Sequence, residues 1–116
     1  MADLQQSFLK PIVLKTPLGF DYFDFDEIIM IEANGNCSNV YRVDRDRYER
    51  VLHNLTFIEV KYSSAKLFRC HKSFIINTSH IEALMIKDHK VVLKNGLEAP
   101  LSEKCLKIMR QLSSIL

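Results

Sequence analysis

Short runs of β-branched and aromatic residues follow one another at close spacing through most of this 116-residue chain. Gly, Asn, Asp and Ser separate the runs, and these residue types favour turns. The pattern predicts a mainly β fold. The expected strands are residues 12–16, 20–25, 28–33, 39–43, 68–70, 73–77, 80–86 and 91–94.

One turn between strands has a specific signature. The segment Lys94-Asn95-Gly96-Leu97 lies between two apolar runs. Asn and Gly both tolerate the positive φ angles that a type I′ turn needs at its two central residues. The sequence therefore predicts a β-hairpin at this point.

Two segments have helical spacing instead. Residues 55–64 favour a short amphipathic helix in the middle of the chain, although a strand remains possible there. Residues 102–115 predict a longer C-terminal helix, for which Ser102 can serve as the N-cap. We interpret the apolar stripe of this second helix as core packing. The stripe consists of Leu106, Met109, Leu112 and Ile115.

Length and composition fit one globular domain. We expect residues 1–11 to be a lead-in and residues 12–116 to form the domain. No apolar run reaches the roughly 18 residues that a membrane helix needs, and the first ten residues do not resemble a signal peptide. These features predict a cytoplasmic protein with no membrane segment.

The three cysteines, Cys37, Cys70 and Cys105, are widely spaced and odd in number. This spacing fits neither a disulfide framework nor a zinc ribbon, so we expect reduced thiols. Cys70 lies between Arg69 and His71, where positive charge could lower its pKa. The favoured interpretation is an unreactive, half-buried cysteine in a strand.

No catalytic or cofactor motif is present in the sequence. The four histidines are scattered, without metal-ligand spacing, and neither a P-loop nor GxGxxG occurs. We therefore expect no enzyme activity and no cofactor. A hydrolase using His71 and Ser73 stays open as an alternative, and it requires both side chains to converge in a cleft.

The charge is unevenly distributed along the chain. Residues 1–58 hold 6 Lys and Arg against 9 Asp and Glu, a net charge of −3, whereas residues 59–116 hold 10 against 5, a net charge of +5. Polar side chains also gather in residues 34–39, 69–73 and 102–104. Asn, Arg, Lys and Ser hydrogen-bond base edges and phosphates, but turns are polar for ordinary reasons too.

The order of these segments is more informative. The string Phe68-Arg69-Cys70-His71-Lys72-Ser73-Phe74-Ile75-Ile76-Asn77 closely resembles the signature of the LytTR DNA-binding family. Ile31-Glu32-Ala33 and Pro100-Leu101-Ser102 fall where that family expects them. The resemblance covers about residues 12–112 and implies an elongated fold of small antiparallel β-sheets with little helix. It implies the DNA-binding output domain of a bacterial response regulator, which reads direct repeats in a promoter through loops placed in successive major grooves.

The resemblance also implies particular contacts. Base contacts would come from Ser38, Lys72 and Lys104, and phosphate contacts from Asn36, Asn39, Ser73, Ser102 and Lys107. Ser38 is shorter than the polar residue that other members place in this loop, so Asn36 or Asn39 is the alternative for the base contact there. Arg69 and His71 belong to the same predicted surface. We interpret His71 as mainly structural, with a base contact as the alternative. In this chain Glu103 separates Ser102 from the cation, and Lys lacks the planar fork of Arg, so Lys104 could contact phosphate instead of a base.

The implied partners are double-stranded DNA, a second copy on an adjacent repeat, and a receiver domain if this chain is part of a longer regulator. The alternative is a small β domain that binds another protein through an exposed sheet edge. That alternative would not require a basic surface around residues 69–73 and 102–107.

Overall fold

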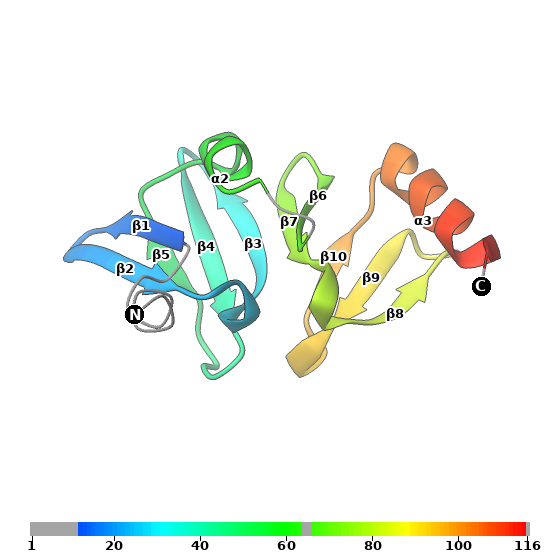
Figure 1. Cartoon of the computed structure of the whole chain (residues 1–116), viewed down its shortest axis with the longest axis horizontal. Helices are drawn as coiled ribbons and strands as arrows, with labels where there is room; N and C mark the ends of the chain where they lie inside the picture. The colour runs from blue at the N-terminus through cyan, green and yellow to red at the C-terminus, as the bar shows by residue number, and fades with distance from the viewer. Residues whose placement is uncertain (1–11, 64–65, 116) are drawn as a thin grey trace, which may run out of the picture.

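The computed structural model describes residues 12–63 and 66–115, although not the side chains of 112–115. The predicted lead-in, residues 1–11, lies outside this range. The domain has three layers arranged along its long axis (Figure 1): a β ribbon with a short helix, a five-stranded sheet, and a three-stranded sheet with a longer helix. Within the described residues no helix is long and apolar enough to cross a membrane.

The middle layer is an antiparallel sheet with strand order β5-β4-β3-β7-β6. Its strands are β3 (Ile28–Asn34), β4 (Cys37–Arg42), β5 (Glu49–Val51), β6 (Leu67–His71) and β7 (Phe74–Asn77). The central strand β3 is buried on both faces. Ile28 and Ile31 face one core, whereas Ile29 and Met30 face the other. An irregularity in register between Ile28 and Met30 allows the adjacent Ile29 and Met30 to face the same core.

The ribbon β1 (Ile12–Thr16) and β2 (Gly19–Phe23) covers one face of the sheet together with α2 (Leu55–Lys61). The predicted middle helix is therefore confirmed. It begins after Asn54, whose side chain accepts a hydrogen bond from Phe57 N at 2.8 Å. The first core is formed by Ile12, Leu14, Phe23, Ile28, Ile31, Val40, Val51, Leu55, Ile58 and Ile75.

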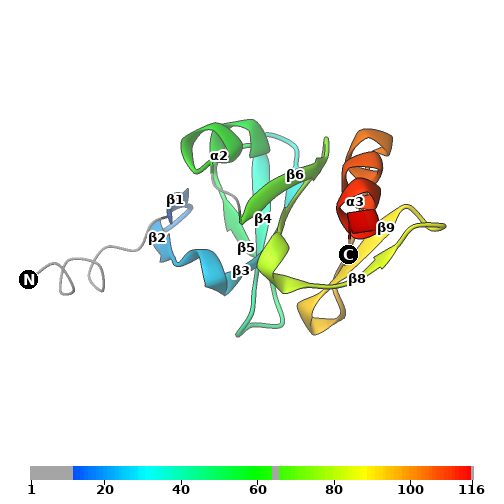
Figure 2. The same cartoon turned by 45° about the vertical axis from the view of Figure 1, so that its right-hand side comes forward.

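The other face packs against β8 (Ile81–Met85), β9 (Lys90–Leu93), β10 (Glu98–Pro100) and α3 (Glu103–Ile115). Figure 2 shows α3 lying along this small sheet. Leu106 is buried and Met109 packs against the same core, which confirms the predicted role of the described part of the apolar stripe. Ser102 Oγ accepts a hydrogen bond from Cys105 N at 3.2 Å, as expected of an N-cap.

The hairpin between β9 and β10 is also confirmed. Asn95 has φ of 63° and Gly96 has φ of 74°, the left-handed backbone that a type I′ turn needs at both central positions. The two residues belong to the short 3-10 turn η3 (Lys94–Gly96).

Most predicted boundaries shift by one to three residues, the middle helix ends at Lys61 instead of residue 64, and one strand was not predicted. The strand expected over 20–25 ends at Phe23, because the 3-10 turn η1 (Phe25–Glu27) follows and Glu27 Oε1 accepts a hydrogen bond from Asp24 N at 3.0 Å. The strand expected from residue 80 begins at 81 after the 3-10 turn η2 (Thr78–His80). The three-residue strand β5 was not predicted, since its sequence, ERV, has no β-rich run.

Candidate nucleic-acid interface

The three polar segments identified in the sequence end together along one edge of the molecule. They lie at the β3–β4 turn, the β6–β7 turn and the start of α3, along the upper edge in both Figure 1 and Figure 2. Backbone hydrogen bonds join them. Ala33 N donates to Ser73 O at 2.8 Å, and Ser102 N donates to Cys70 O at 2.9 Å. The β6–β7 turn is therefore the middle segment of the three.

Arg69 organises this middle turn through its guanidinium group. Nε donates to the carbonyl of His71 at 3.0 Å, and Nη2 donates to the carbonyl of Lys72. Nη1 forms an ion pair with Glu59 Oε1 of α2 at 2.9 Å. A register shift between Arg69 and His71 marks a bulge in β6, and bulges commonly redirect side chains. Arg69 thus fixes the backbone on which the exposed Lys72 is carried.

His71 contributes to the same turn from the other side. Its Nδ1 accepts a hydrogen bond from Ser73 N at 3.1 Å, and its ring meets the ring of Phe74 edge-on with centroids 6.0 Å apart. The expected connection between His71 and neighbouring backbone is therefore present. The bond comes from the amide of Ser73 and not from its hydroxyl, so this contact is not the hydroxyl-to-base pair that a hydrolase needs.

The β3–β4 segment differs most from the prediction. Residues 34–39 do not form one loop, because β4 already begins at Cys37. Ser38 is fully buried, and its hydroxyl donates to the carbonyl of His53 at 2.7 Å. Asn39 is 6% exposed, and its amide donates to Glu32 Oε1 at 3.3 Å. Asn36, in the two-residue turn, is exposed and remains the candidate for a DNA contact.

The start of α3 lies beside the β6–β7 turn. Cys105 Sγ donates to the carbonyl of Arg69 at 3.4 Å, which joins the first helical turn to β6. Between the two elements is a shallow groove of about 410 Å³. Its lining residues are Glu59, Phe68, Arg69, His71, Lys72, Ser102, Lys104, Cys105 and Ile108.

Three basic side chains at this edge carry uncompensated charge. Lys72, Lys104 and Lys107 are exposed. Among residues 12–63 and 66–111 none of the three forms an ion pair, whereas the charge of Arg69 faces Glu59. The edge therefore combines polar turns with free lysines, which is the electrostatic requirement for contacts with phosphate.

Cys70 is enclosed behind the β6–β7 turn. It is fully buried, and its thiol donates to the carbonyl of Pro100 at 3.4 Å. Burial, reinforced by Cys105, raises the pKa of the Cys70 thiol to about 12 and outweighs the opposing effect of Arg69. The charged neighbours therefore do not lower the pKa of this thiol, which agrees with the interpretation of a structural cysteine, although Cys70 is fully buried and not half-buried as expected. All three cysteines are free.

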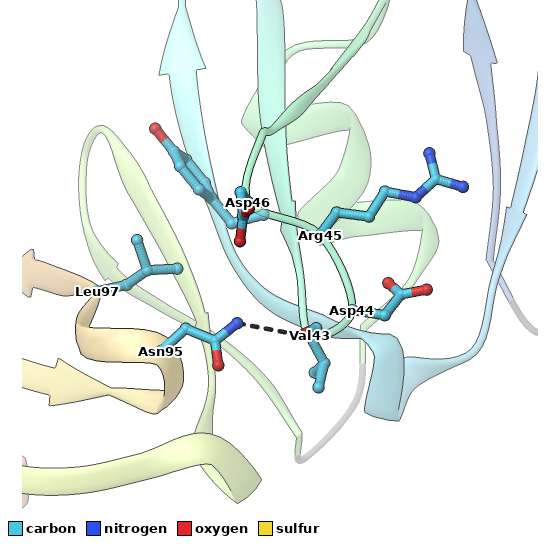
Figure 3. Close-up of a pocket in the computed structure, with 7 residues that line it drawn as sticks. Val43, Asp44, Arg45, Asp46, Asn95 and Leu97 are labelled. Atoms are coloured by element: carbon cyan, nitrogen blue, oxygen red, sulfur yellow. Dashed lines mark hydrogen bonds between the residues drawn. The ribbon is translucent and has the colours of Figure 1, made fainter.

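A second hollow lies at the opposite edge of the molecule, with a volume of about 350 Å³ (Figure 3). Asn95 of η3 points across it and donates through Nδ2 to the carbonyl of Val43 at 3.0 Å. Tyr41 lines it as well and donates its hydroxyl to Glu32 at 3.0 Å. Burial first, and then Glu32, raise the pKa of Tyr41 to about 12. The Asn95–Val43 contact joins the end of β4 to the third layer, whereas the Tyr41–Glu32 bond lies within the middle sheet.

Nothing in the sequence identifies Glu59 as the acidic partner of Arg69. Glu59 lies on the short helix, ten residues before Arg69, and no local pattern connects the two. The Glu59 carboxylate neutralises a guanidinium that the sequence presented as a free cation. Only the packing of α2 beside β6 shows this pairing.

A domain of small antiparallel β-sheets, with polar segments and exposed lysines along one edge, fits the class of DNA-binding domains that are built on β structure. The chain belongs to the LytTr DNA-binding domain family, whose pattern it matches over residues 21–114. Among solved structures it is similar to the LytTr DNA-binding domain of a putative methyl-accepting/DNA response regulator from Bacillus cereus. The TM-score is 0.70 and the identity 26%, with 88% of this chain and 94% of that chain covered.

Two curated relatives add to this comparison. The accessory gene regulator protein A of Staphylococcus epidermidis is 28% identical over 111 residues, which are 96% of this chain and 43% of that protein. The transcriptional regulatory protein BtsR of Salmonella typhi is 33% identical over 52 residues, which are 42% of this chain and 22% of that protein. The chain thus spans less than half the length of these relatives.

Proposed function

We propose that this chain is the sequence-specific DNA-binding part of a bacterial transcriptional regulator in the cytoplasm, with a binding role and no catalytic one. Its three edge segments would enter successive major grooves and read direct repeats in a promoter. The observation that carries this proposal is the alignment of the three segments along one edge, with exposed lysines on two of them. The relatives' names, a response regulator and transcriptional regulators, support it.

The exposure of the side chains supports a division of roles within this interface. Lys72 at the tip of the β6–β7 turn and Asn36 in the β3–β4 turn are the candidates for base contacts. Lys104, Lys107 and the backbone N–H groups at the start of α3 suit phosphates. Arg69 and His71 position the turn. Ser38 and Asn39 stabilise the hairpin from inside the sheet.

Two further partners are part of the proposal. A second copy would bind the adjacent repeat, since one edge of one domain covers only one short site. A receiver domain would be joined to this domain in a longer regulator, because the chain matches less than half of each curated relative.

Selection of bound duplexes from a random DNA pool tests the proposed function. The expected result is enrichment of a short motif that occurs twice with a fixed spacing. Enrichment of one unrepeated motif would retain specific binding and refute the direct repeat. A pool without any enriched motif would refute sequence-specific binding and favour a domain that binds another protein.

A further inference from the structure

A second group of basic side chains lies beside the β3–β4 hairpin, on the side away from the β6–β7 turn. It consists of Lys15 in β1, Arg50 in β5 and Lys61 at the end of α2, and we call it the outer basic patch. Strand β5 follows β4 at the outer end of the sheet order. Arg50 pairs with Asn39 in register, and Arg50 Nη2 lies 3.6 Å from Cys37 Sγ at the hairpin.

The stacked rings of His53 and Phe57 lie next to Lys61, and the residue before His53 is hydrogen-bonded to Lys15. The two rings stack with centroids 4.1 Å apart and an interplanar angle of 10°. Lys61 Nζ lies 5.5 Å from the centre of the Phe57 ring. On the other side Leu52 N donates to the carbonyl of Lys15 at 2.7 Å. The patch is therefore fixed on the strand-to-helix connection that follows β5.

The patch is joined directly to the predicted DNA-binding edge. The carbonyl of His53 accepts the hydroxyl hydrogen bond of Ser38, at the start of β4. The connection that holds Lys15 and Lys61 is thus hydrogen-bonded to the first of the three edge segments. A duplex lying along the edge would meet the patch next, beyond that hairpin.

The charge of the patch is not neutralised within the described residues. All three cations are exposed, and within 12–63 and 66–111 none of them forms an ion pair. The neighbouring Arg42 and Arg45, by contrast, both form ion pairs with Glu49. The environment of His53 is consistent with this unneutralised charge. Burial lowers the pKa of His53 most, and the positive charges of Lys61 and Lys15 lower it further. Like charges held together without acidic partners attract a polyanion.

We propose that the outer basic patch binds backbone phosphates of the DNA duplex beyond the base pairs reached by the three edge segments, and so extends the footprint past the β3–β4 hairpin. The proposal rests on the proposed function. Duplex DNA carries closely spaced phosphates along its whole length. Contacts with them require no particular base sequence, so the patch would add affinity without changing sequence preference.

The test compares two double variants that remove the same charge. Lys15→Gln with Lys61→Gln removes the two lysines beside His53. The control, Arg47→Gln with Lys94→Gln, removes two exposed cations near the opposite edge. Arg47 lies in the β4–β5 connection, at the far end of β4 from the hairpin, and Lys94 lies in η3, which contacts that connection through Asn95 and Val43. Thermal melts establish that both variants are folded.

Binding is measured by titration against a duplex recovered from the selection, at several salt concentrations. Each phosphate contact contributes about 0.9 to the slope of log affinity against log salt. The slope of the Lys15/Lys61 variant should therefore be shallower than that of the wild type by about 1.8, whereas the control keeps the wild-type slope. Removing flanking base pairs from the end of the duplex that meets the patch should weaken the wild type more than the Lys15/Lys61 variant, in which only Arg50 of the patch remains.

The outcomes separate the two proposals. A wild-type slope in the Lys15/Lys61 variant would overturn the outer basic patch as a phosphate site and leave the proposed function standing. Equal losses of slope in both variants would overturn it as well, because the effect would then come from net charge alone. A wild-type protein that binds neither the selected nor a random duplex would overturn both proposals.

Discussion

Arg69 and Lys72 are three residues apart in the family signature, yet their side chains have different structural roles. Arg69 uses its donors on Glu59 and on the carbonyls of His71 and Lys72, so little of its charge faces outward. Lys72 is exposed at the tip of the turn. The sequence identifies both as basic residues of one segment. It could not assign these roles, because they depend on a bulge and on a carboxylate of another element.

Lys72 provides the test of base reading. If it contacts a base, Lys72→Ala should cost about 1–3 kcal/mol on the selected site and much less on random DNA. Lys107→Ala is the matched control, because an exposed lysine that contacts only phosphate should weaken binding to both duplexes about equally. Titrations of each variant against both duplexes measure the difference. An equal loss on both duplexes for Lys72→Ala would make it a phosphate contact.

His71 provides the test of positioning. Since its Nδ1 accepts the hydrogen bond from Ser73 N, His71→Ala should lower the free energy of unfolding by about 0.5–1.5 kcal/mol. DNA affinity should fall as well, because the turn that carries Lys72 is less well held. Thermal melts and binding titrations on the same preparation measure both effects. Unchanged melting together with lost specificity would instead identify His71 as a base-reading residue.

Among the elements, the sequence predicted most strands and both helices, because each has its own periodicity or cap. The failures have a common cause. Strand β5 has only three residues, Glu49–Val51, and it forms because these residues pair with the edge of β4. The segment around Ser38 is polar and therefore resembles a loop. In the fold, however, the Ser38 hydroxyl donates to the carbonyl of His53, fifteen residues further along the chain. Tertiary pairing, which no local pattern contains, determines both.

The β9–β10 hairpin offers a prediction about a single element. Gly96 has φ of +74° and no heavy atom within 4 Å of the position of an added Cβ. The cost of Gly96→Ala should therefore come from the backbone alone, at about 1–2 kcal/mol of unfolding free energy. Lys94→Ala, outside the left-handed region, should cost less. Urea unfolding of the two variants measures this, and equal stabilities would contradict the prediction.

At the scale of the whole molecule, folding rearranges the charge pattern of the sequence. Residues 1–58 carry a net charge of −3, yet Lys15 and Arg50 from this half lie beside Lys61 from the other half. Some acidic side chains of the first half are neutralised within the fold, where Arg42 alone forms ion pairs with both Glu27 and Glu49. Charge counted along the chain therefore underestimates how far the basic surface extends along the edge.

The salt dependence of DNA binding measures the extent of that surface. If only Lys72, Lys104 and Lys107 meet phosphates of a random duplex, log affinity should fall with log salt by about 2.7, at about 0.9 for each phosphate. If the outer basic patch contributes its three cations too, the slope should approach about 5. Anisotropy titrations between about 50 and 200 mM salt cover the range in which such slopes are resolved. Arg69 adds little to either value because it already faces Glu59. A flat titration would count against DNA as the ligand, since no arrangement of exposed lysines can bind a polyanion without releasing its counterions.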